Sequence, residues 1–317
     1  MLSKLKGKVL FVFSDPGGAK PILSLIEEIN LYSCLAVSNR NYSFYDDFKT
    51  QVQILENDFE EIVNSYKPDL IFTGTSYPSD FDKQFLKIAL EKNIECYTFV
   101  DHWTNIDLRF TYENNFLEPS QVWVIDENAK DIAMQAGIPE NKIIISGNPY
   151  HKWLKNWKPK VSKEVFLKKI GLNNNTNKIL LFAPDPLSNI NGIEKYGFDE
   201  ISITQQFISE INSQKDIYKS WKILIKPHPN QDIKKLTRIL NDNESITILS
   251  STIDANHLIY FSDLIFGFIS SFLIEAKILG KKVIRFQSSI NHNDPLSHYS
   301  GLIKINNVNQ LTYELSR

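Results

Sequence analysis

One pattern recurs along the chain and limits what it can fold into: a short apolar run, a polar or glycine-containing loop, and then a helical stretch. In the first half such runs occupy residues 8–13, 69–73 and 95–100, and each ends in a loop with charged or hydroxyl-bearing side chains. Strands that alternate with helices form parallel sheets, whose ligands bind outside the carboxyl ends of the strands. The sequence therefore predicts an α/β fold with its functional residues in these loops.

The pattern starts again in the second half, with apolar runs at residues 178–183, 222–226, 263–266 and 282–286. A chain of 317 residues, of which 42% are hydrophobic, is long enough for two domains of ordinary size. We therefore expect two Rossmann-like domains, each built on a parallel sheet.

Composition narrows the class of protein. The 35 basic and 37 acidic residues give a net charge of -2, so no overall field attracts nucleic acid or a membrane. Cys34 and Cys96 lie in apolar, strand-like runs, which favours buried free thiols of a cytoplasmic protein over a disulfide framework. The amino terminus reads as a first strand rather than a secretion signal, and no stretch is long enough to span a bilayer. We expect a cytoplasmic protein that reaches the inner face of a membrane only as a peripheral visitor.

Two stretches of the second half predict an anion site. Lys226 and His228 follow an apolar run that breaks at a proline, and Ser270 and Ser271 precede a helical run. Serine at a helix start, free backbone N–H groups and the helix dipole together suit a phosphate. Read singly, the first stretch is also an ordinary turn and the second an ordinary helix cap. If the two loops are neighbours in one sheet, they form a site for a nucleotide phosphate, with Glu275 one turn further along the helix.

The pair of stretches resembles the carboxyl-terminal half of the GT-B glycosyltransferases. Within that class, it is most similar to bacterial polysialyltransferases, capsule Kdo transferases and CDP-glycerol glycerophosphotransferases, over roughly the last third of the chain. The resemblance implies that His228, Pro229, Ser270 and Ser271 hold the phosphate of a cytidine nucleotide and that Glu275 binds ribose hydroxyls. In the GT-B pattern Ser188, in the first loop of the second domain, also reaches the donor.

The resemblance also implies a domain plan. Residues 1–150 would form the acceptor domain, residues 151–177 the linker and residues 178–317 the donor domain, with the two sheets facing a central cleft. Chemistry would take place in that cleft.

Asp15 is the candidate base of the first domain. It stands at the end of the first predicted strand, next to Gly17 and Gly18, which allow a ligand to approach the backbone closely. A carboxylate there could take a proton from an acceptor hydroxyl. The alternative is that Asp15 only caps the turn, since Asp-Pro-Gly-Gly is good turn chemistry.

A second polar cluster follows the run at 95–100. Asp101, His102 and Trp103 could form a pocket for an acceptor sugar, with the indole stacked on the sugar face and Arg109 binding a carboxylate or phosphate. The alternative is a satisfied Asp–His pair beside a buried Trp103, with Arg109 in a surface ion pair.

These residues predict a glycosyltransferase that needs no metal ion or other cofactor, since no metal-ligand spacing stands out in the sequence. By resemblance, the donor is a CMP-activated acidic sugar, sialic-acid-like or Kdo, and the acceptor is a glycan hydroxyl in bacterial surface polysaccharide synthesis. Asp15 would deprotonate the acceptor, and His228 would stabilise the departing phosphate.

Other functions remain open at this stage. A UDP-sugar transferase fits the same residues. A non-hydrolysing sugar-nucleotide 2-epimerase shares the architecture and needs acid and base carboxylates around a UDP-sugar. A non-catalytic, GT-B-like glycan-binding subunit is the third alternative, and it would tolerate the loss of Asp15. If Asp15 lies too far from the phosphate site, Asp101 or His102 is the next candidate base.

Overall fold

The computed structural model describes residues 5–29, 34–172, 178–240, 245–288 and 294–316. Contacts divide the chain into two compact units, Met1–Asn156 and Trp157–Arg317, which we call the N-terminal and C-terminal units. The stretch that the sequence assigned to a linker, residues 151–177, is shared between them, because the helix Pro149–Leu154 belongs to the first unit and Lys163–Lys169 to the second.

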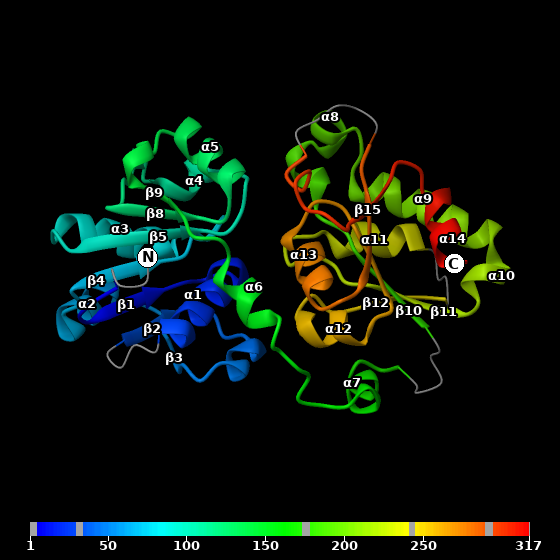
Figure 1. The fold of residues 1–317 in the computed structure, drawn as a ribbon, viewed down its shortest axis with the longest axis horizontal. Coiled ribbons are helices and arrows are strands. Elements are labelled where there is room, and N and C mark those ends of the chain that lie inside the picture. Colours follow the sequence, from blue (N-terminus) through cyan, green and yellow to red (C-terminus); the bar gives the residue numbers. More distant parts are fainter. Residues whose placement is uncertain (1–4, 30–33, 173–177, 241–244, 289–293, 317) are drawn as a thin grey trace. The chain divides into compact units, whose positions relative to one another are not determined.

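The N-terminal unit alternates strands and helices (Figure 1). Its strands are β1 (Val9–Val12), β2 (Cys34–Ser38), β3 (Val52–Ile54), β4 (Leu70–Thr73), β5 (Glu95–Val100), β8 (Gln121–Val124) and β9 (Ile143–Ile145), with a small hairpin of β6 (Thr111–Tyr112) and β7 (Asn115–Phe116). Its helices are α1 (Pro16–Ile29), α2 (Phe59–Tyr66), α3 (Phe81–Glu91), α4 (Ile106–Phe110), α5 (Glu127–Gln135) and α6 (Pro149–Leu154), with 3-10 turns η2 (Ser43–Asp47) and η3 (Glu140–Lys142).

The C-terminal unit follows the same plan. Its strands are β10 (Lys178–Ala183), β11 (Trp221–Ile225), β12 (Ile246–Ile248), β13 (Leu264–Gly267), β14 (Lys282–Phe286) and β15 (Ile303–Ile305). Its helices are α7 (Lys163–Lys169), α8 (Gly192–Tyr196), α9 (Glu200–Ser213), α10 (Lys215–Tyr218), α11 (Ile233–Leu240), α12 (Ala255–Phe261), α13 (Ser271–Ile278) and α14 (Asn309–Leu315), with the 3-10 turn η4 (Leu187–Ile190).

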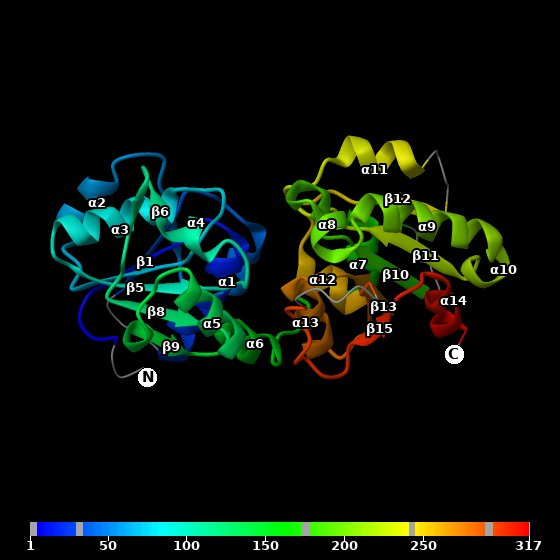
Figure 2. The same cartoon turned by 90° about the horizontal axis from the view of Figure 1, so that it is seen from above.

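Both main sheets are parallel and share one strand order. The N-terminal sheet runs β3-β2-β1-β4-β5-β8-β9 and the C-terminal sheet runs β12-β11-β10-β13-β14-β15. In each sheet the first three strands are added toward one edge, and the later strands are added toward the other edge. This change creates a switch point between β1 and β4 and another between β10 and β13. Within each sheet, right-handed crossovers then place the helices that connect the first strands on one face and the helices that connect the later strands on the other. In the C-terminal unit α9 and α11 lie on one face and α12 and α13 on the other (Figure 2).

The strands form where the sequence is apolar without interruption. In β10 every residue after Lys178 is buried, as expected of a central parallel strand covered by helices on both faces. The helix α9 is capped by Asp199, whose side chain accepts a hydrogen bond from the N–H of Ser202 in a capping box. Strand and helix boundaries thus follow the sequence pattern closely.

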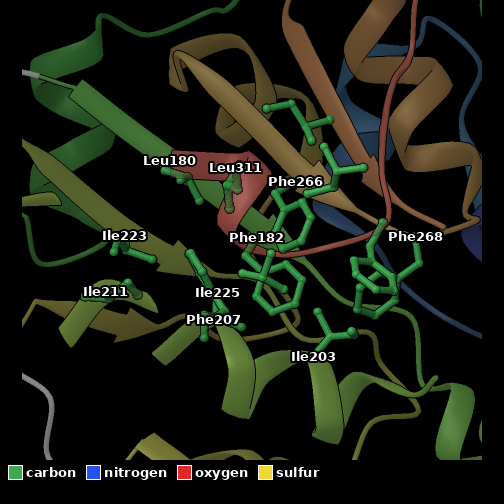
Figure 3. Close-up of a cluster of buried hydrophobic side chains, with 14 of the residues drawn as sticks. Leu180, Phe182, Ile203, Phe207, Ile211, Ile223, Ile225, Phe266, Phe268 and Leu311 are labelled. Carbon is green, nitrogen blue, oxygen red and sulfur yellow. The ribbon is translucent and has the colours of Figure 1, made fainter. Parts of the chain in front are cut away.

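Aromatic side chains fill the core of the C-terminal unit (Figure 3). The ring of Phe182 on β10 stacks on Phe266 of β13 with centroids 4.9 Å apart, and it meets Phe207 of α9 edge-on at 5.6 Å. All three are fully buried, and each contributes roughly 2 to 3 kcal/mol of apolar burial to stability. The core fixes β10 at the centre of the sheet and so fixes the loops that leave its carboxyl edge. Within the described residues, no helix combines the length and apolar character that crossing a bilayer requires.

Candidate functional site

The loops after β1, β4 and β5 meet at the carboxyl edge of the N-terminal sheet, beside its switch point. Two of their backbones approach so closely that a Cβ added to Gly18 would lie 3.2 Å from the Cα of Gly74. A Cβ added to Gly17 would lie 2.0 Å from a carboxylate oxygen of Asp101. Gly17 and Gly18, assigned to acceptor binding from the sequence, therefore make room for other protein groups, and this packing is itself a sufficient reason for glycine at both positions.

The carboxylate of Asp15 joins two other loops of this edge. Its Oδ1 accepts a hydrogen bond from Nη1 of Arg40 at 2.8 Å, and its Oδ2 accepts one from the backbone N–H of Tyr77 at 3.1 Å. The turn into α1 is closed instead by the backbone carbonyl of Asp15, which accepts from the N–H of Gly18. Burial raises the pKa of Asp15, and the charge of Arg40 opposes that rise. In its described contacts the Asp15 side chain thus binds two other loops and not the turn that it begins.

Asp82 is a carboxylate that the sequence reasoning missed. It lies in the first turn of α3, is 3% exposed, and accepts a hydrogen bond from the N–H of Ser76 at 2.7 Å. The hydroxyl oxygen of Ser76 in turn accepts from the N–H of Asp15 at 3.0 Å. Burial raises the pKa of Asp82 to about 7, and the charges of Asp15 and Asp101 add to the rise. An acidic residue in a first helical turn is usually a surface partner of the dipole, so the sequence gives no signal of this burial.

Arg40 is a second residue that was missed. It comes two residues after β2 ends, and its side chain is 46% exposed, so one part of the guanidinium faces solvent while Nη1 holds Asp15. Nη1 also lies 3.4 Å from the hydroxyl of Tyr42. A cation directly after a strand of this edge was a signal in the sequence that could have been used.

Arg109 is tied into the protein. Its Nη1 lies 3.2 Å from Oδ1 of Asp101 and also donates to the carbonyl of Thr75, while its Nε donates to the carbonyl of Thr104 at 3.1 Å. Both side chains of the ion pair are largely buried. The surface ion pair considered for Arg109 is thus wrong, and the guanidinium instead holds the loops after β4 and β5 together.

Trp103 does not offer its face to a sugar. The residue is 3% exposed, and its indole N–H donates to both carboxylate oxygens of Asp126, at 3.0 and 2.9 Å. The expected stacking on a sugar face is therefore corrected to a packing role. His102 is half-buried, and its Nδ1 lies 3.0 Å from the hydroxyl of Thr104.

In the C-terminal unit, His228 stands at the carboxyl end of β11 in a defined tautomer. Its Nδ1 accepts a hydrogen bond from the N–H of Asn230 at 3.1 Å, so the neutral ring carries its proton on Nε2. By surface area the residue is exposed, yet desolvation and the charge of Lys226 lower its pKa to about 4. Any lowering leaves the ring neutral at pH 7. His228 can then donate one hydrogen bond from Nε2 to an anion. Pro229, next to it, is exposed.

Lys226 turns toward the outer side of the sheet. Its Nζ donates to the carbonyl of Ser251 at 3.0 Å, in the loop after β12. The strand order also separates the two predicted loops, because β10 lies between β11 and β13. Two strand spacings put their ends roughly 10 Å apart, so His228 and Ser270 meet one ligand only if it spans the loop after β10. The two loops thus lie at the same edge of one sheet, but on strands separated by β10.

The N-terminus of α13 is already occupied by a carboxylate. Ser270 is its N-cap residue, with an extended backbone and no capping bond from its side chain, and Ser271 is half-buried in the first turn. Asp185, after β10, accepts a hydrogen bond from the N–H of Ile269 at 2.9 Å. Burial raises the pKa of Asp185 to about 6, although hydrogen bonds from Ile269 and Ser270 oppose the rise. Glu275 is 9% exposed, further along α13.

Ser188 binds the carboxylate of Glu200 through both its side chain and its backbone. Its hydroxyl donates to Oε1 of Glu200 at 2.6 Å, and its backbone N–H donates to Oε2 at 2.8 Å. The loop that carries Ser188 also contacts the His228 loop, since the side-chain amide of Asn189 donates a hydrogen bond to the carbonyl of Asn230 at 2.9 Å. The loop after β10 therefore connects the two halves of the expected phosphate site. Within the described residues, no group of three or more His, Cys, Asp or Glu has the arrangement of a metal site.

No protein-family model matches the chain, and no curated protein matches it by sequence. Solved structures do match it along almost the whole chain. The UDP-GlcNAc 2-epimerase from Neisseria meningitidis bound to UDP-GlcNAc is 14% identical with a TM-score of 0.66, and 98% of this chain covers 91% of that one. Methanocaldococcus jannaschii UDP-GlcNAc 2-epimerase in complex with UDP-GlcNAc and UDP is 18% identical with a TM-score of 0.61, over 98% and 92% of the two chains. Anabaena HepE in complex with UDP-glucose is 14% identical with a TM-score of 0.63, over 97% and 88%.

At this identity the likeness shows the fold. The chain has the GT-B type of α/β architecture, two Rossmann-like domains with parallel sheets, as the sequence predicted. The nucleotide named in these three structures is a uridine nucleotide, whereas the sequence motifs pointed to a cytidine nucleotide.

Proposed function

We propose that the protein is an enzyme that acts on a nucleotide-activated sugar. In this proposal the switch point of the C-terminal sheet binds the nucleotide phosphates, and the carboxylates at the switch point of the N-terminal sheet move protons. Support comes from the neutral His228, whose Nε2 carries the proton, and from the N-terminus of α13. Both stand at one carboxyl edge, where α/β sheets bind such ligands.

A uridine diphosphate sugar is the substrate class that we now favour. The sequence motifs alone favoured a CMP-linked acidic sugar. The compared proteins of the same fold are complexes with UDP, UDP-GlcNAc or UDP-glucose, which supports the UDP alternative.

The reaction that the N-terminal unit supports best is epimerisation at C2 of the sugar, next to the anomeric carbon, as in a non-hydrolysing 2-epimerase. The observation that carries it is the set of three acidic side chains, Asp15, Asp82 and Asp101, around the single loop after β4. Loss of the C2 proton leaves an electron pair that forms a C1–C2 double bond and expels the nucleotide diphosphate from C1. The diphosphate then adds back at C1 while a proton returns to the opposite face of C2, so the reaction needs groups that titrate near neutral pH. Burial raises the pKa of both Asp15 and Asp82 in that direction.

Glycosyl transfer to a glycan hydroxyl is the second candidate, and the sequence Lys226-Pro227-His228-Pro229 followed by Ser270-Ser271 favours it. A transferase needs one base, for which Asp15 suffices, and an acceptor glycan as partner. Work at the inner face of a membrane, in surface polysaccharide synthesis, belongs to this second candidate.

The test begins with binding. Thermal unfolding of the protein is followed with UDP, CMP, CDP and GDP, because a ligand of the folded state alone raises the unfolding temperature. We expect UDP to stabilise the protein and His228→Ala to reduce the effect. Stabilisation by CMP alone would restore the CMP-sugar transferase, and no response to any nucleotide would favour a non-catalytic glycan-binding subunit.

The reaction is then read by NMR of UDP-GlcNAc in deuterated water. An epimerase replaces the C2 proton with deuterium without any acceptor, and Asp15→Asn should lose this exchange while still binding UDP. Release of UDP only when a glycan acceptor is added would show transfer instead. Exchange that continues in Asp15→Asn would remove Asp15 from the mechanism and leave Asp82 and Asp101 as candidates.

A further inference from the structure

A carboxylate stands where the nucleotide phosphate is expected in the C-terminal unit. Asp185 comes two residues after β10 ends at the switch point, and its side chain accepts a hydrogen bond from the N–H of Ile269, just before α13. Only 8% of the residue is exposed. A phosphate that uses the N–H groups at this helix start must therefore come close to Asp185.

The surroundings of Asp185 do not neutralise it. Glu200 of α9 faces Asp185 and is 2% exposed. Tyr196 of α8 faces it as well. Glu275 lies on α13, beyond the first turn of that helix. Among the described residues, the groups that act on the pKa of Asp185 include no lysine or arginine, and Glu200 binds Ser188. Beyond β10, the amino group of Lys226 is turned to the carbonyl of Ser251.

Two anions side by side in a buried site repel each other strongly, because water screens them poorly there. A carboxylic acid in the same place would do the opposite, since its O–H can donate a hydrogen bond to a phosphate oxygen. Burial already raises the pKa of Asp185 to about 6, so the protonated form lies within easy reach at neutral pH.

We propose that Asp185 takes up a proton from solvent when a nucleotide diphosphate binds at the N-terminus of α13, and that its carboxyl group then donates a hydrogen bond to a phosphate oxygen. This inference rests on the proposed nucleotide site. It makes Asp185 a phosphate-binding residue, and it makes nucleotide affinity decrease as the pH rises.

The size of the effect follows from the fraction of protein in the binding-competent, protonated form. Above pH 6 that fraction falls about tenfold for each pH unit, and the apparent dissociation constant rises by the same factor. At pH 8, about two units above the pKa of Asp185, the loss reaches about a hundredfold. His228 does not produce this slope, because its lowered pKa leaves the ring neutral throughout the range.

The test is calorimetric titration of the whole protein with UDP-glucose at pH 6, 7 and 8. Both phosphates of UDP-glucose are esterified, so the ligand avoids the titration near pH 6 of a terminal phosphate. We expect the dissociation constant of the wild type to rise about tenfold from pH 7 to pH 8. Asp185→Asn, which resembles the protonated form, should show a flat profile and bind up to about a hundredfold more tightly than the wild type at pH 8.

Asp263→Asn is the matched control. Asp263 also accepts a backbone N–H, that of Ile179, but it precedes β13 at the opposite edge of the same sheet, so its substitution should leave the pH profile unchanged. In His228→Gln the affinity should fall while the pH dependence persists, which separates Asp185 from the histidine.

Proton uptake provides a measurement that needs no variant. Titrations at pH 7.5 in two buffers with different heats of ionisation should give about one proton taken up for each UDP-glucose bound. A pH-independent affinity, no proton uptake, or weaker binding by Asp185→Asn at pH 8 would each overturn the role of Asp185 and leave the nucleotide site intact. If UDP-glucose does not bind at any pH, the proposed nucleotide site fails, and the role of Asp185 fails with it.

Discussion

Replacing Asp82 by asparagine should change how the stability of the N-terminal unit depends on pH. The carboxylate is 3% exposed, and burial raises its pKa from 3.8 to about 7. Between about pH 4 and pH 7 the folded protein therefore binds more protons than the unfolded chain, so stability falls as the pH rises through this window and stays constant above it. Each pKa unit corresponds to about 1.4 kcal/mol, so ionisation of Asp82 costs about 4 kcal/mol above pH 7.

The asparagine cannot ionise and avoids this cost. Its carbonyl oxygen can still accept the N–H of Ser76, which now donates to Oδ2 at 2.7 Å. Its amide N–H₂ would replace Oδ1, which is buried and lacks a hydrogen-bond partner among the described residues, and a buried donor without a partner costs about 1 to 3 kcal/mol at every pH. The difference in unfolding free energy, variant minus wild type, should thus rise by about 4 kcal/mol from pH 4 to pH 7.

The free energy of unfolding is measured with urea at a series of pH values. Hydrogen exchange of peptides that cover β4 and α3 then assigns the transition to the N-terminal unit. Asp107→Asn is the control, because this carboxylate is exposed on α4 of the same unit and its replacement should leave the profile unchanged. A difference for Asp82→Asn that is flat to within about 1 kcal/mol from pH 4 to pH 7 would refute the reasoning about burial.

Three further predictions concern single contacts. Arg40→Met removes the cation that lowers the pKa of Asp15, so the acidic limb of the pH–rate profile should move to higher pH; an unmoved limb would show that Asp15 is not the titrating base. His228→Ala should weaken UDP binding about tenfold or more, measured by calorimetry, and His228→Gln should retain part of the affinity because its amide can replace the Nε2–H donor. Arg285→Met should lower the stability of the C-terminal unit by about 3 kcal/mol in thermal or urea unfolding, because Arg285 is fully buried and bidentate with Asp294; a loss below about 1 kcal/mol would mean that the pair is not needed there.

Much of the fold was predictable from local pattern. The apolar runs at 95–100, 178–183 and 282–286 coincide with β5, β10 and β14, because each is a continuous run of residues buried on both faces. The sequence could not give the order of strands. The position of β10 between β11 and β13 separates the loops of His228 and Ser270, and it is set by long-range packing.

The site was predictable only where a residue follows a strand. Asp15, Asp101 and His228 all stand at carboxyl ends of strands, and the structure places them at the expected edges. Which of these side chains the protein itself engages depends on contacts distant in sequence. Asp185 and Asp82 were missed because their burial, at 8% and 3% exposure, depends on how the folded chain packs around them.

The close approach of Gly17 to Asp101 couples two positions that are far apart in sequence. A methyl group at position 17 would meet the Asp101 carboxylate at 2.0 Å, and that carboxylate cannot easily withdraw because Arg109 and Thr75 bind its Oδ1. In evolutionary terms, alanine at position 17 becomes acceptable only after position 101 has shortened, for example to serine. Descendants of this chain should therefore change the two positions together, and a glycine at 17 marks those that have kept the acidic group.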